Sequence, residues 1–202
     1  MRSGTLSIAG VSCLALRVSF TGDLGWEIYC DTNKQEIVYK ALVQEAVNEQ
    51  GGPVGSRALM SLRIEKGYGS WSREYSPEIW PHECGLEKLC KLDKEFLNKA
   101  ALSDNLKKDP RENLVLIHLN EEDCQASNAD ATGGEPIFKN GKGLGRVTSG
   151  AYGYSVGMSL ALGYVKDVVP GDCVDVMVLG QPHRGKILKT PPFDPEGKIL
   201  RS

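Results

Sequence analysis

The N-terminal part of the chain begins with two strand-like stretches, residues 13–20 and 26–30. Between them lies the run Thr21-Gly22-Asp23-Leu24-Gly25, whose residue types favour a turn. Because strands joined by a short turn pair with one another, the pattern predicts a β-hairpin.

Helical periodicity follows this hairpin. In residues 37–47, apolar side chains recur at steps of three and four, and the Gly-Gly-Pro run at 51–53 ends the pattern. A second helix is expected to begin with Ser56 as its N-cap, to carry Arg57 in its first turn and to end before Gly67.

The second half of the chain has a different pattern, in which short apolar runs alternate with glycine, proline or asparagine. This pattern predicts an all-β unit, a small barrel or sandwich. The predicted strands are Leu114–Leu119, Pro136–Phe138, Gly145–Ser149, Leu160–Tyr164, Cys173–Leu179 and Gly185–Leu188. The expected fold class is therefore α+β, with a hairpin and helices first and strands afterwards.

Three irregular stretches separate these elements. Residues 69–85 are rich in serine, proline and aromatic residues, and we expect an ordered loop that buries its aromatic rings. Residues 104–113 are charged and contain a proline, which is typical of a boundary between two units. Residues 121–133 are polar and predict an excursion from the β-rich unit.

Composition excludes several classes of function. The chain has 202 residues, 24 basic and 26 acidic side chains and a net charge of −2, so it lacks the basic surface that nucleic acids require. Apolar runs such as 114–117 and 176–179 are too short to span a bilayer. We expect no membrane partner, and a cytoplasmic protein, or one of the mitochondrial matrix if the source is eukaryotic.

The residues that usually carry chemistry are sparse. Six cysteines contain no C-x-x-C pair, and three histidines lie far apart, so we expect reduced thiols and no metal site. The glycines of residues 141–145 lack the spacing of a dinucleotide-binding loop and predict a turn. No catalytic residue is assigned from the pattern.

Glu27 is the main candidate for a binding residue, because it lies on a predicted strand between Trp26 and Ile28. A buried carboxylate needs a cation or a ligand with N–H donors as its partner. Strand alternation offers another interpretation, in which Glu27 shares a solvent-facing side with Gly25 and Tyr29. The pattern alone favours the solvent-facing side.

Four stretches, RVSFTGDLGWEIY (17–29), GSRALMSLRIEKGY (55–68), PHECGLEKLCKLDKEFLNKAAL (81–102) and GLGRVTSGAYGYSVGMSLALGYV (143–165), resemble the aminomethyltransferase family that includes the glycine-cleavage T-protein. With the closing PPFDP (191–195), they are most similar to the tetrahydrofolate-binding C-terminal region of dimethylglycine and sarcosine dehydrogenases. The resemblance implies that the chain is a C-terminal fragment of such a protein.

The resemblance implies a tetrahydrofolate site made by Glu27, which hydrogen-bonds the pterin, Phe20, which lines or stacks on it, and Arg57, a polar contact near the folate. Alternatives are core packing for Phe20 and, for Arg57, an ion pair with Glu65 or another surface carboxylate. The family's catalytic aspartate lies upstream of this region and has no counterpart here. Leu89 lies in the segment where the T-protein has a tryptophan.

The resemblance also divides the chain. Residues 1–103 correspond to the second half of a folate-binding α/β domain, 104–113 to a linker, and 114–202 to the C-terminal β-barrel domain. FAD is expected only in an N-terminal flavin domain that this chain does not include. The expected partners are folate, a one-carbon unit derived from an N-methyl amine, and a flavin dehydrogenase domain or subunit.

The implied function is to position folate so that it captures a one-carbon unit from an oxidised N-methyl amine, and we expect the isolated chain to be inactive. Two alternatives stay open. One is a non-catalytic module like the regulatory subunit of pyruvate dehydrogenase phosphatase. The other is a folate-dependent sulfonium demethylase.

Overall fold

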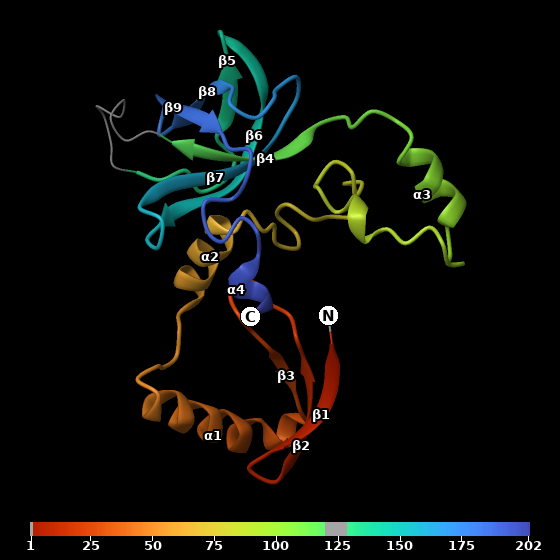
Figure 1. Cartoon of the computed structure of the whole chain (residues 1–202). Helices are drawn as coiled ribbons and strands as arrows, with labels where there is room; N and C mark the ends of the chain where they lie inside the picture. The colour runs from red at the N-terminus through yellow and green to blue at the C-terminus, as the bar shows by residue number, and fades with distance from the viewer. Residues whose placement is uncertain (1, 120–128) are drawn as a thin grey trace.

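The computed structural model describes residues 2–119 and 129–202, which form a lower lobe, a central helix and a β-barrel (Figure 1). The lower lobe and centre contain β1 (Ser3–Ile8), β2 (Val11–Leu16), β3 (Glu27–Tyr29), η1 (Thr32–Lys34), α1 (Gln35–Asn48), α2 (Ser56–Glu65), η2 (Glu87–Leu89) and α3 (Lys99–Asn105). The remainder contains β4 (Asn113–Leu119), β5 (Pro136–Lys139), β6 (Lys142–Gly153), β7 (Met158–Val165), β8 (Cys173–Val178), β9 (Gln181–Ile187) and α4 (Lys198–Arg201). The predicted α+β class with a C-terminal barrel is confirmed.

The lower lobe is built on an antiparallel sheet of order β1-β2-β3. The predicted hairpin is the β2–β3 pair, in which Leu14 lies opposite Tyr29 and Leu16 opposite Glu27. Strand β1 was not predicted. It joins β2 through Ala9 and Gly10, both at positive φ (48° and 80°), which is the geometry of a tight hairpin turn.

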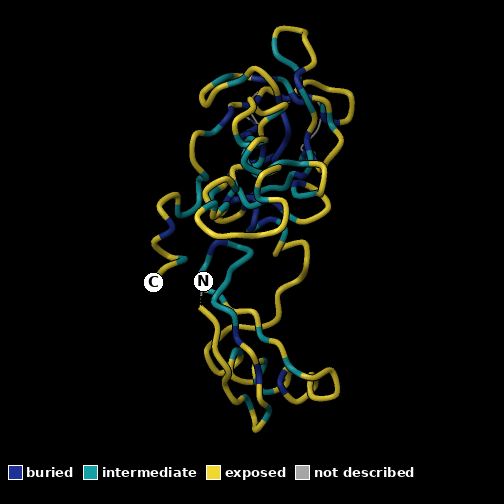
Figure 2. Tube along the Cα trace, turned by 90° about the vertical axis from the view of Figure 1, so that its right-hand side faces the viewer, coloured by how far each residue is buried: buried dark blue, intermediate teal, exposed yellow. Residues whose placement is uncertain are grey.

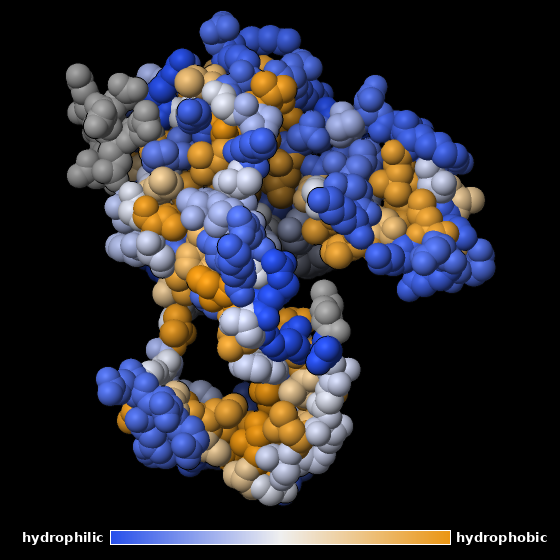
Figure 3. Space-filling view, viewed as in Figure 1, coloured by the Kyte–Doolittle hydropathy of each residue, from blue (hydrophilic) through white to orange (hydrophobic). Residues whose placement is uncertain are grey.

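Helix α1 confirms the first helical prediction, but the lobe that it forms with the sheet is thinly packed. Val38 is the buried residue of α1, whereas Ile37, Leu42 and Val47 are exposed. Figure 2 shows that most of the chain trace in this lobe is exposed, whereas more of the trace in the barrel is buried. Figure 3 shows apolar residues on the surface of the lower lobe. Helix propensity and a small core therefore hold this lobe with little apolar burial.

Helix α2 connects the lobe to the barrel. It begins at Ser56 with Gly55 in the N-cap position, so the prediction that Ser56 caps the helix was one residue off. Gly67 follows the helix at φ 69°, where a residue without a Cβ is favoured. Ile64 packs with Leu116, Leu160 and Leu162 of the barrel, and this apolar cluster fixes the helix on the strands.

The barrel is closed in the order β4-β7-β6-β5-β8-β9, with β9 pairing back onto β4. Each of the six predicted strands is present, and β6 is longer than predicted. The turns Asn140-Gly141 and Leu179-Gly180 have positive φ at both residues, as two-residue hairpins require. The barrel core includes Ile117, Leu119, Ala131, Ile137, Leu144, Val147, Ala161, Val165, Val174, Val176, Val178 and Ile187.

The irregular stretches gave mixed outcomes. The loop at 69–85 was expected to bury its aromatic rings, but Trp71 is 70% exposed because it projects from a tight turn that pairs it with Tyr75. Of the excursion predicted at 121–133, residues 121–128 lie outside the described residues, and Ala131 is fully buried in the barrel core. None of the helices in the described part of the chain has the length and apolar character needed to cross a membrane.

Candidate functional site

Two cavities lie beside the loop that follows α2. The first, which we call the α2 cavity, has a volume of about 840 Å³ and is lined by α2, β6 and residues 130 and 132. The second, the Phe20 cavity, has a volume of about 1010 Å³ and lies between the end of β2, the loop after α2 and the C-terminal segment. Both are of the size that small organic ligands occupy.

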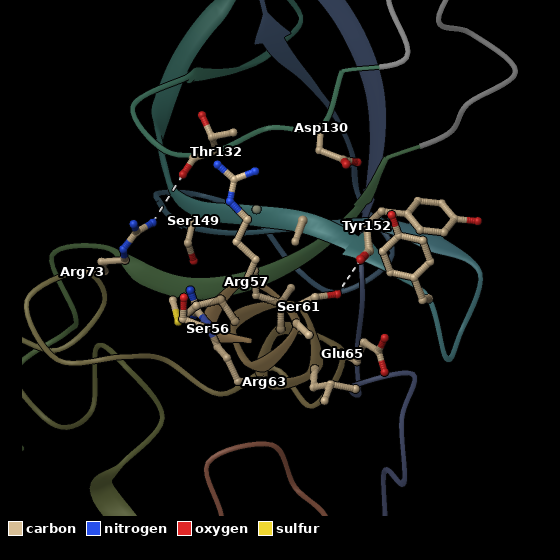
Figure 4. Close-up of a pocket in the computed structure, with 17 residues that line it drawn as sticks. Ser56, Arg57, Ser61, Arg63, Glu65, Arg73, Asp130, Thr132, Ser149 and Tyr152 are labelled. Atoms are coloured by element: carbon tan, nitrogen blue, oxygen red, sulfur yellow. Dashed lines mark hydrogen bonds between the residues drawn. The ribbon is translucent and has the colours of Figure 1, made fainter. Parts of the chain in front are cut away.

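Arginines give the α2 cavity its charge. Arg57 reaches from the first turn of α2 toward Thr132, and the Nη1 of Arg73 donates to the Thr132 carbonyl oxygen at 3.5 Å (Figure 4). The predicted alternative of an Arg57–Glu65 ion pair is wrong, because buried Glu65 instead accepts a hydrogen bond from the Ser155 backbone N–H at 3.0 Å. Within the described residues Arg57 has no ion pair, so its guanidinium is available to an anionic group.

A buried ion pair lies beneath this cavity and fixes the loop. Arg63 and Glu74 are both fully buried, with the Arg63 Nη1 3.1 Å from the Glu74 Oε2. Ser70 donates its backbone N–H and hydroxyl to the same oxygen, at 2.8 and 3.2 Å. The other carboxylate oxygen accepts from the hydroxyls of Thr148, at 2.6 Å, and Ser149. Glu74 therefore joins α2, the loop and β6.

The hydrogen bonds around Glu74 also decide its protonation state. Burial by itself would raise the pKa of this carboxyl group. The hydroxyls of Ser149 and Thr148, the N–H of Ser70 and the charge of Arg63 outweigh burial and lower the pKa below its ordinary value. Glu74 is therefore a structural anion.

The Phe20 cavity combines aromatic walls with arginines. Phe20, Tyr68 and Tyr75 line it together with Arg2, Arg17 and Arg201. The Tyr75 hydroxyl accepts the backbone N–H of Gly69 at 3.0 Å, which fixes the ring of Tyr75. Its described lining contains no Asp, Glu or His side chain.

Arg17 forms the side of the Phe20 cavity that meets the C-terminal segment. Its guanidinium lies 4.9 Å from the centre of the Trp26 ring and donates to the Gly25 carbonyl oxygen at 3.3 Å. It also donates to the carbonyl oxygens of Leu200 and Ser202, both at 3.1 Å. The end of α4 is thereby held against the turn that carries Phe20.

A second buried ion pair holds the segment before α4. The Lys66 Nζ lies 3.0 Å from the Asp194 Oδ2, and both side chains are 5% exposed. Burial alone would raise the pKa of Asp194, but Lys66 and the backbone N–H groups of residues 198–200 hold it at about 2. Asp194 therefore stays ionised near neutrality.

Glu27 lies at the start of β3 and is exposed, so the solvent-facing alternative is correct and the buried one is wrong. Its Oε2 accepts a hydrogen bond from the Tyr29 hydroxyl at 2.5 Å, which confirms that the two side chains share the outward face. This hydrogen bond raises the pKa of Tyr29. Glu27 lines neither cavity, Phe20 lines one and Arg57 the other, so the structure does not bring the three predicted residues into one cavity.

Sequence reasoning missed the buried charged residues Arg63, Glu65, Lys66, Glu74 and Glu83. Glu83 is held by a bidentate ion pair, in which Arg111 Nε and Nη2 each donate to one of its oxygens at 2.7 Å. These bonds, against the opposing effect of burial, lower the pKa of Glu83 to about 2. For Arg63, Glu65 and Lys66 the sequence shows only a charged run within the apolar periodicity of residues 59–67, and this run does not identify their partners.

The described part of the chain contains no cluster of His, Cys, Asp and Glu that could hold a metal ion. Its five described cysteines are free thiols, of which Cys13 is buried and Cys173 exposed.

Comparison with known proteins gives two family matches. Residues 1–94 match the GCVT N-terminal domain, and residues 113–194 match the glycine cleavage T-protein C-terminal barrel domain. The first match includes the lower lobe and α2, and the second covers the barrel.

Individual relatives agree with these matches. The chain is 33% identical over 195 residues to mitochondrial dimethylglycine dehydrogenase of Homo sapiens, covering 95% of this chain and 22% of the relative. It is 29% identical over 184 residues to an aminomethyltransferase of Desulfitobacterium hafniense, covering 90% of this chain and 49% of that protein. The chain thus spans less than half the length of each of these relatives.

A solved structure gives the same fold. The crystal structure of glycine cleavage system aminomethyltransferase T from Bartonella henselae superposes with a TM-score of 0.79 at 24% identity. The superposition covers 91% of this chain and 50% of that one.

Proposed function

Because the chain belongs to the glycine-cleavage T-protein family, we propose that it is the C-terminal part of a tetrahydrofolate-dependent aminomethyltransferase module. Its role is to position folate so that the cofactor captures a one-carbon unit from an oxidised N-methyl amine. Mammalian dimethylglycine and sarcosine dehydrogenases among its relatives support this donor class, and a flavin dehydrogenase domain or subunit would generate the oxidised amine.

The observation that carries this proposal is the composition of the Phe20 cavity. Aromatic rings suit the flat face of a pterin, and arginines suit the carboxylates of a folate tail. Leu89, which stands in the segment where the T-protein has a tryptophan, also lines the cavity and supplies an aliphatic contact. The residues present therefore fit a reduced folate.

The three site residues have separate roles in this proposal. Phe20 packs against the pterin ring in the Phe20 cavity. Glu27 does not line this cavity, and its hydrogen bonds to the amino edge of the pterin are proposed from the family resemblance alone. Arg57, which has no described ion pair, meets an anionic part of the folate from the α2 cavity. When bound, tetrahydrofolate supplies the nucleophilic nitrogen atoms that accept the one-carbon unit.

The chain's own contribution to the reaction is orientation. Holding the folate nitrogen near the electrophilic carbon lowers the entropic part of the activation barrier for one-carbon transfer. The described lining of the Phe20 cavity has no Asp, Glu or His side chain to move a proton, so we propose that this group comes from outside these residues. The isolated chain is accordingly expected to bind folate weakly and to be inactive.

Isothermal titration of tetrahydrofolate into the complete gene product that contains this chain tests the proposal. Glu27→Ala and Phe20→Ala are each expected to weaken binding by about 10-fold, which corresponds to a loss of ~1.4 kcal/mol. Tyr39→Ala, an exposed aromatic substitution on α1, is the matched control and is expected to leave affinity unchanged. Equal affinities for the wild type and the Phe20 and Glu27 variants would refute the assigned site.

A further inference from the structure

Two thiols face each other at the end of the sheet in the lower lobe. The antiparallel register pairs Leu16 with Glu27, Ala15 with Ile28 and Leu14 with Tyr29. One more step along this register places Cys13 opposite Cys30. Directly opposite residues of antiparallel strands point to the same side of the sheet, so both thiols lie on one face.

Separation across the strands is suited to a covalent link. Opposite Cα atoms of antiparallel strands lie about 4.5 or about 5.5 Å apart, depending on the type of pair. Both values fall within the range of about 4.4–6.8 Å that disulfides span. The link therefore needs rotation of the two side chains and little movement of the backbone.

Burial gives the two thiols different roles. Cys13 is 1% exposed, on the same buried face as Ala15, whereas Cys30 is half-buried just after β3. Burial and the neighbouring Cys30 raise the pKa of the Cys13 thiol, which agrees with contact between the two sulfur atoms. Cys30 is the thiol that a soluble reagent reaches first.

We propose that Cys13 and Cys30 are a redox-active pair that forms a reversible disulfide between β2 and the end of β3. The oxidant is a low-molecular-weight disulfide such as oxidised glutathione. The Cys30 thiolate attacks one of its sulfur atoms and releases one small thiolate, leaving a mixed disulfide on Cys30. The Cys13 thiolate then attacks the Cys30 sulfur and releases the second small thiolate. Two electrons pass to the oxidant, and the two thiolates leave as thiols with the protons that the cysteines have lost.

The link has a direct structural consequence. Strand β3 is only three residues long, so few ladder hydrogen bonds hold it to β2. A bond from Cys13 to Cys30 closes residues 13–30 into a ring that contains both Phe20 and Glu27. Oxidation would restrict this segment, and reduction would release it. The disulfide itself does not depend on whether folate binds.

The test is peptide mapping of the chain after equilibration with oxidised and reduced glutathione, followed by alkylation of the free thiols. Trypsin cleaves after Arg2, Arg17 and Lys34, so Cys13 and Cys30 fall on the separate peptides 3–17 and 18–34. We expect these two peptides to be linked under oxidising conditions and to separate after reduction. The linked species should weigh about 2 Da less than the sum of the two unalkylated peptides, as loss of two hydrogen atoms requires.

Variants assign the roles. In Cys13→Ala, Cys30 is expected to stop at the glutathione mixed disulfide, and in Cys30→Ala, Cys13 is expected to stay reduced. Cys173→Ala removes an exposed thiol of the barrel and should leave the linked peptides unchanged. The wild-type measurement needs no substitution, so it decides the question even where a variant folds poorly. Absence of the link at an oxidant level that fully modifies Cys173 would overturn the proposal, and so would a link that forms only between two chains.

Discussion

Replacement of Glu74 by glutamine is expected to lower the free energy of unfolding by about 3–5 kcal/mol, because it leaves a buried arginine without its counter-charge. Glu74 and Arg63 have fully buried side chains, and water cannot replace the lost carboxylate without opening the loop. The amide also turns an acceptor into a donor that faces the hydroxyls of Thr148 and Ser149. The free energy of unfolding of a typical domain is only about 5–15 kcal/mol, so this loss is a large share of the total stability.

Urea unfolding followed by far-ultraviolet circular dichroism measures this loss. With a slope of about 2 kcal/mol per molar, the midpoint should fall by about 2 M. Glu36→Gln is the matched control, because the exposed Glu36–Lys40 pair should contribute less than about 1 kcal/mol. The double variant Arg63→Met with Glu74→Leu should be more stable than Glu74→Gln, since it buries no charge. A loss below about 1 kcal/mol for Glu74→Gln would refute the reasoning.

Two further predictions concern Glu83 and the barrel. The pKa of Glu83 is lowered from 4.5 to about 2, so the stability that its pairing with Arg111 contributes is present above pH 4.5 and is lost as the pH falls toward 2. In Glu83→Gln the melting temperature should be lower at pH 6 and should fall less steeply between pH 4.5 and pH 2. An unchanged slope of melting temperature against pH would contradict this assignment. Gly145→Ala places a Cβ against the carbonyl oxygen of Tyr164 and should reduce the melting temperature strongly. Gly143→Ala, whose added Cβ has its nearest contact at 3.8 Å, should be tolerated. Equal melting temperatures for the two variants would show that the strands shift apart to accommodate the Cβ.

The barrel was predictable from sequence because its signals are local. Strand β8 is rich in valine and is followed by the turn Leu179-Gly180, and β5 and β6 are joined by Asn140-Gly141. Glycine and asparagine adopt the positive φ that these turns need, so they mark the ends of the strands. Strand β1 was missed because its turn, Ala9-Gly10, carries a weaker signal and the strand is rich in small polar residues.

The buried charges were not predictable because their partners are distant in sequence. Glu74 is bonded by Thr148, which lies 74 positions away, and no local pattern reveals this contact. For Glu27, strand alternation correctly grouped it with Tyr29, whereas the expectation of burial failed because β3 lies at the edge of the sheet. Pattern gives the face of a strand, but burial depends on what covers that face.

The contacts of Glu74 also bear on how this protein changes during evolution. Residues 104–113 are the predicted linker. The carboxylate of Glu74 nevertheless takes hydrogen bonds from β6, which follows these residues, and its counter-charge from α2, which precedes them. A gene fusion or exchange that joined this barrel to an unrelated helix would leave Arg63, or the hydroxyls of Thr148 and Ser149, buried without their hydrogen-bond partner. The helix and the barrel are therefore expected to be inherited together.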